Sequence, residues 1–220
     1  MVQLSTLGIM LTREQAVAIL NPFRFGDGTF MVQCRGERPR SELIPSKDSL
    51  ELIFPNQDWV DFAGTCDGLR DLWIDRPSAK SLDCITKLPL RHLSVTYPSY
   101  VRDWRFLSQL WGLRYLRLAN VTSLQTLDHI ADLVHLEVLI LAGTYSRNLK
   151  VPSLKPLSRL TNLRIVIFAS FRPQDWSLVP LHEMGRLEHF SCPSSCPVKE
   201  LKSLQDRHPI LRLIDDDADA

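Results

Sequence analysis

Hydrophobic residues return along this chain in a short pattern that repeats about every 23 residues. The pattern has an apolar residue, two variable residues, a second apolar residue, one variable residue and a third apolar residue. The intervals between successive first positions are 21, 23, 23, 27, 24 and 23 residues, and these positions are Leu69, Leu90, Leu113, Leu136, Leu163, Leu187 and the degenerate Ile210. The alternation at the end of each copy predicts a short β-strand.

A second pattern lies between the predicted strands, with apolar residues three or four positions apart, as in Leu82, Ile85 and Leu88. This spacing predicts one apolar stripe on a short helix or 3₁₀ turn. Side chains that can cap such a helix precede five of these stretches: Ser81, Asp103, Thr126, Ser153 and Asp175. Each unit is therefore predicted to be a strand, a turn, a short helix and a return, which buries its apolar side only when stacked on its neighbours.

The repeat resembles that of leucine-rich-repeat proteins, and its unit length is similar to the short-repeat intracellular and bacterial types such as the internalins. The resemblance covers residues 69–215 and implies an α/β solenoid with a parallel β-sheet on the concave side and short helices or 3₁₀ turns on the convex side. The family usually has asparagine three residues after the third apolar position, where this chain has Pro77, Pro98, Val121, Thr144, Phe171 and Ser195. The turn backbone must therefore be satisfied in another way. The alternative, an ordinary α/β domain with leucine-rich segments, would not produce so regular an interval.

Residues 1–60 do not show the repeat, and we expect them to form an N-terminal capping region. About seven units at residues 61–215 would form the solenoid, followed by an acidic tail at 216–220. Within the cap, a capping box at Thr12–Gln15 predicts a helix over 12–20, and strands are expected at 30–34 and 50–54. The pair Asp58 and Trp59 repeats the Asp-Trp pair at 103–104, which indicates a further helix starting there.

The residues on either side of the second apolar position point away from the core of the predicted strands. In the family this outward side is the concave surface that commonly binds ligands. Four β-branched residues of two neighbouring strands would form an exposed apolar patch there, and such patches commonly mark interfaces. The alternative is that a loop, the acidic tail or self-association covers the patch. The predicted partner-binding residues are Trp73, His92, Tyr115, Arg117, Val138, Ile140, Ile165, Ile167 and His189.

The predicted sheet alone is small for a stable complex. Seven strands about 4.8 Å apart expose on the order of 400–500 Å² of surface, whereas a standard interface takes about 800 Å² per partner. Loops at 97–102 and 144–150 are therefore expected to contribute. A partly acidic partner is also expected, because five arginines lie on or beside the first three strands against Asp71 and Asp75: Arg70, Arg76, Arg91, Arg114 and Arg117. A solvated rim of arginines is an equal alternative.

Composition limits the classes of partner. The formal net charge of +1 provides no general attraction to nucleic acid or to an anionic membrane. No apolar run approaches the roughly 20 residues that cross a bilayer, and the first residues do not resemble a signal peptide. Five cysteines, an odd number, favour a reducing compartment. We therefore expect a cytoplasmic protein without nucleic-acid or membrane partners; the oligomeric state stays open.

Few residues suggest chemistry. His189, Cys192, Cys196 and His208 resemble a zinc site only weakly, because the cysteine spacing is marginal and no second pair accompanies it. No nucleotide-binding or hydrolase motif occurs, so neither a metal nor a cofactor is expected. These features predict a non-catalytic protein-binding module that acts as an adaptor, inhibitor or immunity factor. The alternative is an enzyme whose repeats select the substrate and whose chemistry lies in residues 1–60, where Cys34 is the one plausible nucleophile.

Overall fold

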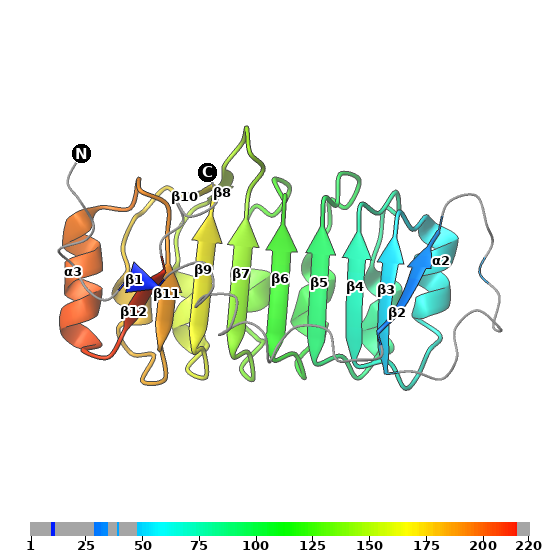
Figure 1. Ribbon diagram of the computed structural model, residues 1–220, viewed down its shortest axis with the longest axis horizontal. Coiled ribbons are helices and arrows are strands. Elements are labelled where there is room, and N and C mark those ends of the chain that lie inside the picture. The colour runs from blue at the N-terminus through cyan, green and yellow to red at the C-terminus, as the bar shows by residue number, and fades with distance from the viewer. Residues whose placement is uncertain (1–9, 12–28, 35–38, 40–47, 215–220) are drawn as a thin grey trace.

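The computed structural model describes residues 10–11, 29–34, 39 and 48–214, which form a ten-stranded parallel sheet and a separate two-stranded sheet (Figure 1). The order across the large sheet is β1-β12-β11-β9-β7-β6-β5-β4-β3-β2. From β2 to β12, its strands therefore follow one another across the sheet in the order of the sequence. The large sheet contains β1 (Met10–Leu11), β2 (Phe30–Gln33), β3 (Ser49–Ile53), β4 (Asp71–Asp75), β5 (His92–Thr96), β6 (Tyr115–Ala119), β7 (Val138–Ala142), β9 (Ile165–Ala169), β11 (His189–Ser191) and β12 (Arg212–Ile214).

Short helices lie in a row behind one face of this sheet (Figure 1). The predicted 3₁₀ turns are confirmed, and the two α-helices, α2 and α3, lie at the ends of the row. None of the helices in the described part of the chain is long and apolar enough to cross a membrane. The helices are α2 (Gln57–Ala63), η4 (Asp83–Lys87), η5 (Arg105–Gln109), η6 (Asp128–Ile130), η7 (Lys155–Arg159), η8 (Val179–Leu181) and α3 (Val198–Arg207).

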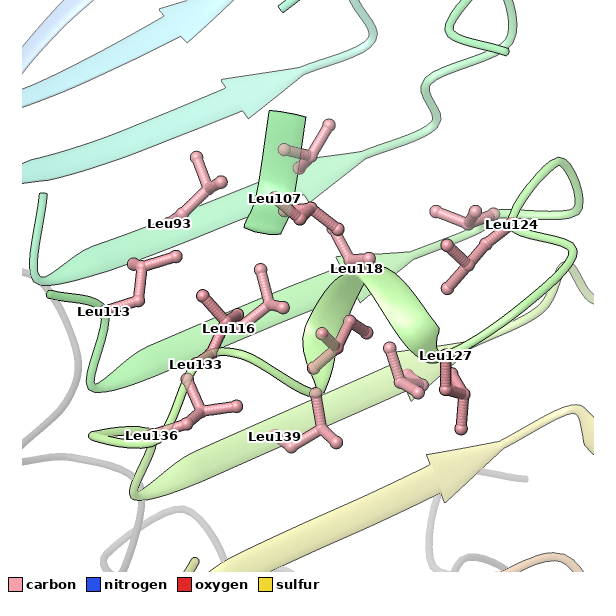
Figure 2. Close-up of a cluster of buried hydrophobic side chains, with 14 of the residues drawn as sticks. Leu93, Leu107, Leu113, Leu116, Leu118, Leu124, Leu127, Leu133, Leu136 and Leu139 are labelled. Atoms are coloured by element: carbon pink, nitrogen blue, oxygen red, sulfur yellow. The ribbon is translucent and has the colours of Figure 1, made fainter. Parts of the chain in front are cut away.

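The repeated apolar residues form one continuous core between the sheet and the helices. Leu116 and Leu118 of β6 belong to the same buried cluster as Leu93 and Leu139 of the neighbouring strands and Leu127, which directly precedes η6 (Figure 2). In the first six units, the first and second apolar positions are all buried, so the inward direction predicted for them is confirmed. The burial of leucine at the same place in successive units removes apolar surface that a single unit would expose to water.

The last unit differs from the prediction by one residue. Ile210 is 77% exposed, and Leu211 is buried in its place. The amide of Leu211 donates to the carbonyl of His208, as that of Leu187 donates to Met184 in the preceding unit. Leu211 is thus the structural equivalent of Leu187, and the turn that leads into β12 is one residue shorter than in the other units.

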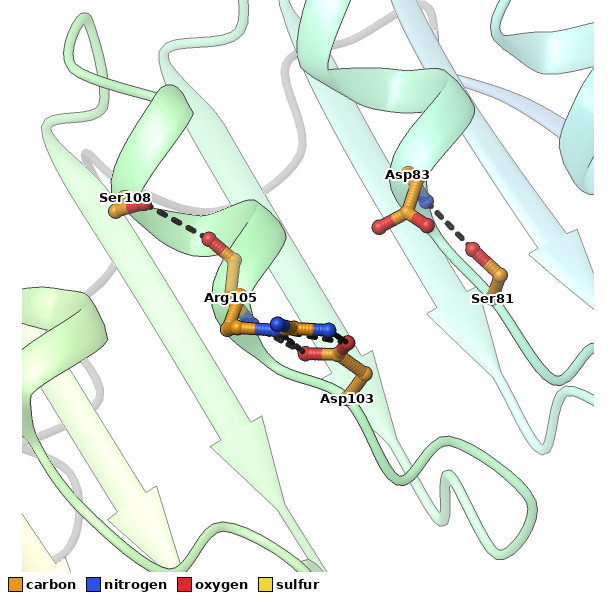
Figure 3. A network of polar contacts seen from close by, with 5 residues as sticks. All are labelled: Ser81, Asp83, Asp103, Arg105 and Ser108. Atoms are coloured by element: carbon orange, nitrogen blue, oxygen red, sulfur yellow. Dashed lines mark hydrogen bonds and ion pairs between the residues drawn. The ribbon is translucent and has the colours of Figure 1, made fainter.

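Side-chain oxygens cap the starts of the 3₁₀ helices. Ser81 accepts a hydrogen bond from the amide of Asp83, and Asp103 accepts one from the amide of Arg105 (Figure 3). The guanidinium of Arg105 also holds the Asp103 carboxylate through side-chain hydrogen bonds, and together with the amide it lowers the pKa of Asp103 to about 2. Thr126 and Ser153 cap in the same way, as predicted.

At the next helix, the prediction of Asp175 as the cap is wrong. Ser177 accepts the bond from the amide of Val179 instead. The helix η8 starts at Val179, so the residue two positions before its start is Ser177, and Asp175 is too far from the first helical amides.

In the turns after the strands, backbone amides donate to backbone carbonyls rather than to asparagine side chains. A positive φ occurs at five residues, each of which comes directly after a strand: Phe54, Arg76, Tyr97, Asn120 and Ser170. In this conformation the amide of Arg76 reaches the carbonyl of Thr96 in the next unit, and the amide of Tyr97 reaches Ala119. Hydrogen bonding thus continues one residue beyond the strands, which explains how the turns form without the asparagine of the family.

The longest unit, of 27 residues, contains an insertion beyond the end of β7. Within it, β8 (Leu149–Val151) pairs in parallel with β10 (Phe171–Pro173) of the next unit, and the tip carries the fully exposed Tyr145. The insertion starts at Gly143, where the backbones of Arg147, Leu149 and Ser170 approach so closely that a Cβ atom would overlap them. Glycine is therefore required at the base of this insertion.

The sheet runs without a break through the region expected to be a cap. The strands predicted at 30–34 and 50–54 are present as β2 and β3, and β3 pairs with β4 over its whole length. The expected further helix is α2, with Asn56 accepting from the amide of Trp59. The predicted helix over 12–20 and the acidic tail at 216–220 lie outside the described residues. The division between cap and solenoid at residue 60 stays a prediction.

The shared core makes a clear prediction for stability. Leu139→Ala removes a fully buried side chain from the centre of the core, and we expect the free energy of unfolding to fall by about 2–5 kcal/mol. Val134→Ala, at a side chain that is 41% exposed, is the control and should change it little. Urea denaturation followed by circular dichroism measures both. Equal effects of the two variants would contradict the shared core.

The close approach at Gly143 predicts a backbone effect. Gly143→Ala should lower the free energy of unfolding by roughly 1–3 kcal/mol, because backbone atoms must move to admit the methyl group. Gly68→Ala is the matched control, since a Cβ atom there meets nothing within 4 Å. The same denaturation assay compares the two variants. A Gly143→Ala protein as stable as Gly68→Ala would show that the insertion does not need glycine.

Candidate interaction surface

The face of the sheet opposite the helices, here called the outer face, carries side chains in regular cross-strand rows. It is the face predicted above to be concave. Register between the strands places the residues before the second apolar position in one row and those after it in the next. The first row is Ser49, Asp71, His92, Tyr115, Val138, Ile165 and His189, and the second is Glu51, Trp73, Ser94, Arg117, Ile140, Ile167 and Ser191.

The outer face of β4 to β6 is polar and partly exposed. The ring Nδ1 of His92 lies within hydrogen-bond distance of the Asp71 carboxylate. On its other side the ring meets Tyr115 edge to face, with 6.0 Å between the centroids. In the next row, Arg117 donates to the hydroxyl of Ser94 at 3.4 Å. Cross-strand contacts therefore fix His92 and Arg117 in position, and Trp73 lies half-buried on β4 between them and the end of the sheet.

Carboxylates accumulate where the outer face meets β3. Asp75 accepts hydrogen bonds from the hydroxyl of Thr96 and from the guanidinium of Arg76. Glu51 lies on the neighbouring strand, and burial, together with the nearby charge of Asp75, raises its pKa above the ordinary value. Arg76 thus contacts Asp75, while the pKa of Glu51 reflects its burial and the negative charge of Asp75.

The apolar part of the outer face, here called the apolar patch, consists of Tyr115, Val138, Ile140, Ile165 and Ile167. The structure brings its predicted members together on β6, β7 and β9, but the expectation that they are exposed is wrong. The exposed fraction is 0% at Val138, 3% at Ile165, 7% at Tyr115 and 9% at Ile140, and Ile167 is half-buried. Their part in partner binding stays a prediction.

His189 continues the row beyond the apolar patch and is also buried. Its Nδ1 atom has no hydrogen-bond partner among the residues that the structure describes. Burial lowers the pKa of His189, and this outweighs the opposite effect of the Glu188 carboxylate. The ring is therefore held in its neutral form over a wider pH range than an exposed histidine.

An aromatic and cationic cluster lies at the edge where the strands end. The guanidinium of Arg76 stands over the ring of Phe54 at 5.5 Å and over that of Tyr97 at 4.9 Å. All three residues have positive φ and follow consecutive strands, so the turn conformation aligns them. Sequence reasoning did not identify Phe54, because nothing in the pattern shows that these three turns share one conformation. Exposed Tyr100 extends this edge within the predicted loop 97–102.

The five arginines of the predicted basic region do not lie in one place. Arg70, Arg91 and Arg114 directly precede β4, β5 and β6, so they line the edge where the strands start, and all three are exposed. Arg76 lies at the opposite edge and Arg117 on the outer face between them. Glu137 directly precedes β7 and so follows Arg114 along the edge where the strands start. It forms an ion pair with Arg114 at 3.5 Å, and the basic stretch therefore ends after the first units.

The weak zinc-like set has other contacts. His208 is hydrogen-bonded through Nε2 to the carbonyl of Leu181 inside the core, and Cys196 is buried. All five cysteines are free thiols, so Cys192 and Cys196 are not bonded to each other. Among the described residues, no group of three or more histidine, cysteine or acidic side chains could hold a metal ion.

A pocket of about 360 Å³ opens on the helix side, next to η5 and η6. Arg102, Arg105 and His129 contribute to its lining, together with Asp103. The carboxylate of Asp103 pairs with the guanidinium of Arg105, as described above, and also caps the helix that begins at Arg105. The pair of Asp103 and Arg105 at this pocket is therefore explained by its role at the start of η5.

Comparison with known proteins identifies the fold. No protein-family model matches the sequence, and no curated protein matches it. Among solved structures, it is similar to internalin C2 from Listeria monocytogenes, with 17% identity and a TM-score of 0.52 over 74% of this chain and 70% of that chain. It is also similar to an internalin (inlF) from the same organism, with 17% identity and a TM-score of 0.56 over 97% and 72% of the two chains. The chain therefore has the leucine-rich-repeat solenoid fold predicted from its sequence.

The burial of His189 predicts how stability depends on pH. Below pH about 6.5 the unfolded chain binds a proton at this ring, while the folded protein binds it only at lower pH. The free energy of unfolding should therefore decrease as the pH falls below about 6.5, and His189→Gln should reduce this decrease. Urea denaturation at pH 7.5 and 5.5 measures it. Replacement of exposed His135 by Gln is the control; an equal change in both variants would contradict the assignment to His189.

Proposed function

We propose that this protein is a non-catalytic recognition module that binds a protein partner through the outer face of its sheet, in an adaptor, inhibitor or immunity-type role. One observation carries the proposal: Trp73, His92 and Arg117 stand partly exposed on three neighbouring strands, and cross-strand contacts hold His92 and Arg117 in position. Tryptophan and arginine are the residue types enriched among the energetic anchors of protein interfaces. Side chains that are already fixed lose little conformational entropy when a partner binds.

The proposed interface extends over the two edges of the sheet. The polar part of the outer face is too small for a standard interface of about 800 Å² per partner. The cluster of Phe54, Arg76 and Tyr97 adds aromatic surface where the strands end. Arg70, Arg91 and Arg114 add positive charge where they start, and we propose that a partly acidic part of the partner lies against this edge. Neither a cofactor, a metal, nucleic acid nor a membrane is part of the proposal.

The residues that the structure describes within 1–60 do not favour the alternative enzyme function. Cys34, its one plausible nucleophile, is buried, and its thiol donates to the carbonyl of Val32. Burial raises the pKa of Cys34 to about 12. The thiolate is the reactive form, so this cysteine is not activated. The free thiols of the chain suit a reducing compartment, and a cytoplasmic location remains part of our proposal.

The proposal predicts a selective loss of binding. Trp73→Ala combined with Arg117→Ala should weaken partner binding at least about tenfold, because each anchor residue contributes on the order of 1–2 kcal/mol. Affinity purification with quantitative mass spectrometry identifies the partner, and titration with the purified partner measures the dissociation constant.

The matched control is Val179→Ala, which changes an exposed residue of η8 on the helix side. This variant should bind like the unchanged protein. Circular dichroism establishes that all variants are folded. A folded double variant that retains every partner with unchanged affinity would refute the proposed surface.

A further inference from the structure

The insertion that follows β7 carries an unbalanced group of cations. Lys150 of β8 and Arg172 of β10 are register partners in the parallel pair of strands, and both are exposed while the residues on either side of them are buried. Their side chains therefore leave the same face of this small sheet, from backbones about 4.8 Å apart. Arg147, in the loop that leads into β8, adds a third exposed cation. These three residues are here called the basic ledge.

Carboxylates do not balance the charge of the basic ledge. Other surface arginines pair with a carboxylate of a neighbouring unit, as Arg159 does with Asp132 and Arg164 with Glu188, each at 2.9 Å. Among the residues that the structure describes, no member of the basic ledge forms an ion pair. Like charges on neighbouring strands repel each other, so this arrangement opposes the pairing of β8 with β10 rather than supporting it.

The insertion holds the basic ledge in a defined position. Its unit is 27 residues long, against 21 to 24 in the others, and the extra chain rises beyond the ends of the neighbouring strands (Figure 1). The amide of Thr144 donates to the carbonyl of Arg147, and the amide of Arg147 donates to the Thr144 hydroxyl. These bonds close the loop beside the fully exposed Tyr145. In repeat proteins, insertions within single units often lie on the binding face.

An acidic protein segment fits these cations best. The planar guanidinium group can bind a carboxylate through two parallel hydrogen bonds, and the ammonium group of Lys150 adds a point charge beside that of Arg172. Nucleic acid fits less well, because its affinity depends on the number of phosphates neutralised, and three cations on a chain of net charge +1 neutralise few. Tyrosine and arginine are also enriched at the energetic anchors of protein interfaces, and Tyr145 lies two residues from Arg147.

We propose that the basic ledge is a second docking surface, which binds an acidic segment of a protein partner. Carboxylates of that segment supply the negative charges that the fold itself does not place next to Arg147, Lys150 and Arg172. The basic ledge lies beyond the ends of β7 and β9, away from the residues of the proposed outer-face interface. The inference therefore goes beyond the proposed function and stands whether or not the outer face binds a partner.

Site-specific photo-crosslinking of a labelled poly-glutamate peptide to the full-length protein tests the proposal. Tyr145 is replaced by p-benzoylphenylalanine, and the yield of crosslinked peptide is measured at low salt. Lys150→Gln with Arg172→Gln should lower this yield about fivefold to tenfold, because each exposed ion pair contributes a fraction of the binding free energy. The control, Lys87→Gln with Lys202→Gln, removes the same charge from exposed positions on the helix side and should change the yield less than about twofold.

Two further variants separate this surface from the other proposed contacts. Trp73→Ala with Arg117→Ala should leave the yield from position 145 unchanged, and so should Arg70→Gln with Arg91→Gln. Loss of natural partner binding in those variants together with unchanged crosslinking here would support both surfaces independently. A photo-reactive residue at Val179, exposed on the helix side, gives the background yield.

Four results would overturn the proposal. The first is a yield from position 145 no higher than that from position 179. The second is an equal loss in the ledge variant and in the Lys87 and Lys202 control, which would show a response to net charge alone. The third is stronger crosslinking of a labelled single-stranded DNA with the same dependence on Lys150 and Arg172. The fourth is a severalfold rise in yield on deletion of residues 215–220, which would assign the surface to the acidic tail of this chain.

Thermal unfolding at two salt concentrations measures the repulsion directly. Lys150→Gln should raise the melting temperature by about 1–3 °C at low salt, and the gain should shrink at high salt because salt screens the repulsion. Lys202→Gln is the matched control and should change it little at either salt concentration. If Lys150→Gln lowers the melting temperature equally at both, Lys150 stabilises the fold, and the charge of the basic ledge no longer indicates a partner.

Discussion

The whole structure depends on the stacking of leucine side chains from one unit onto those of the next. A single unit of strand and 3₁₀ turn has one apolar side and nothing of its own to cover it. When Leu116 lies between Leu93 and Leu139, each unit completes the core of its neighbours. The period of about 23 residues is the length of chain that returns each leucine to the same place, so the core, the sheet and the row of helices all follow from it.

Because the core uses one side of every strand, the other side is free to vary. On β4 and β5 this outer face carries charged and polar groups that contact one another across the strands, and on β7 and β9 it carries aliphatic residues that are buried or half-buried. The turn after each strand adds a second variable row. There, the positive φ of Phe54, Arg76 and Tyr97 brings three side chains from three units into one cluster.

The sequence predicted the elements that local patterns mark, and it failed for contacts between residues far apart in the chain. Strands, inward leucines and four of the helix caps follow from local patterns, so they could be located from residue types alone. The burial of Val138 and Ile165 could not be predicted, because it concerns the outer face of the sheet and no local pattern in the sequence shows that side chains there are covered. The ring contacts of Arg76 were also missed, since they arise from turn geometry. The absence of the family asparagine was visible in the sequence, but the backbone bonds that replace it were not.

The pairing of Met10 with Leu213 has a consequence for how the protein folds. In an open array of repeats, end units can fray while the middle stays intact, and folding can start at any unit and spread. Here the last unit has a strand from the beginning of the chain as its outer neighbour, so its edge is complete only when both ends of the polypeptide have met. Such a long-range contact is slow to form. It also means that unfolding of the last unit leaves β1 without the strand on which it pairs. We therefore expect this solenoid to melt as one cooperative body rather than unit by unit.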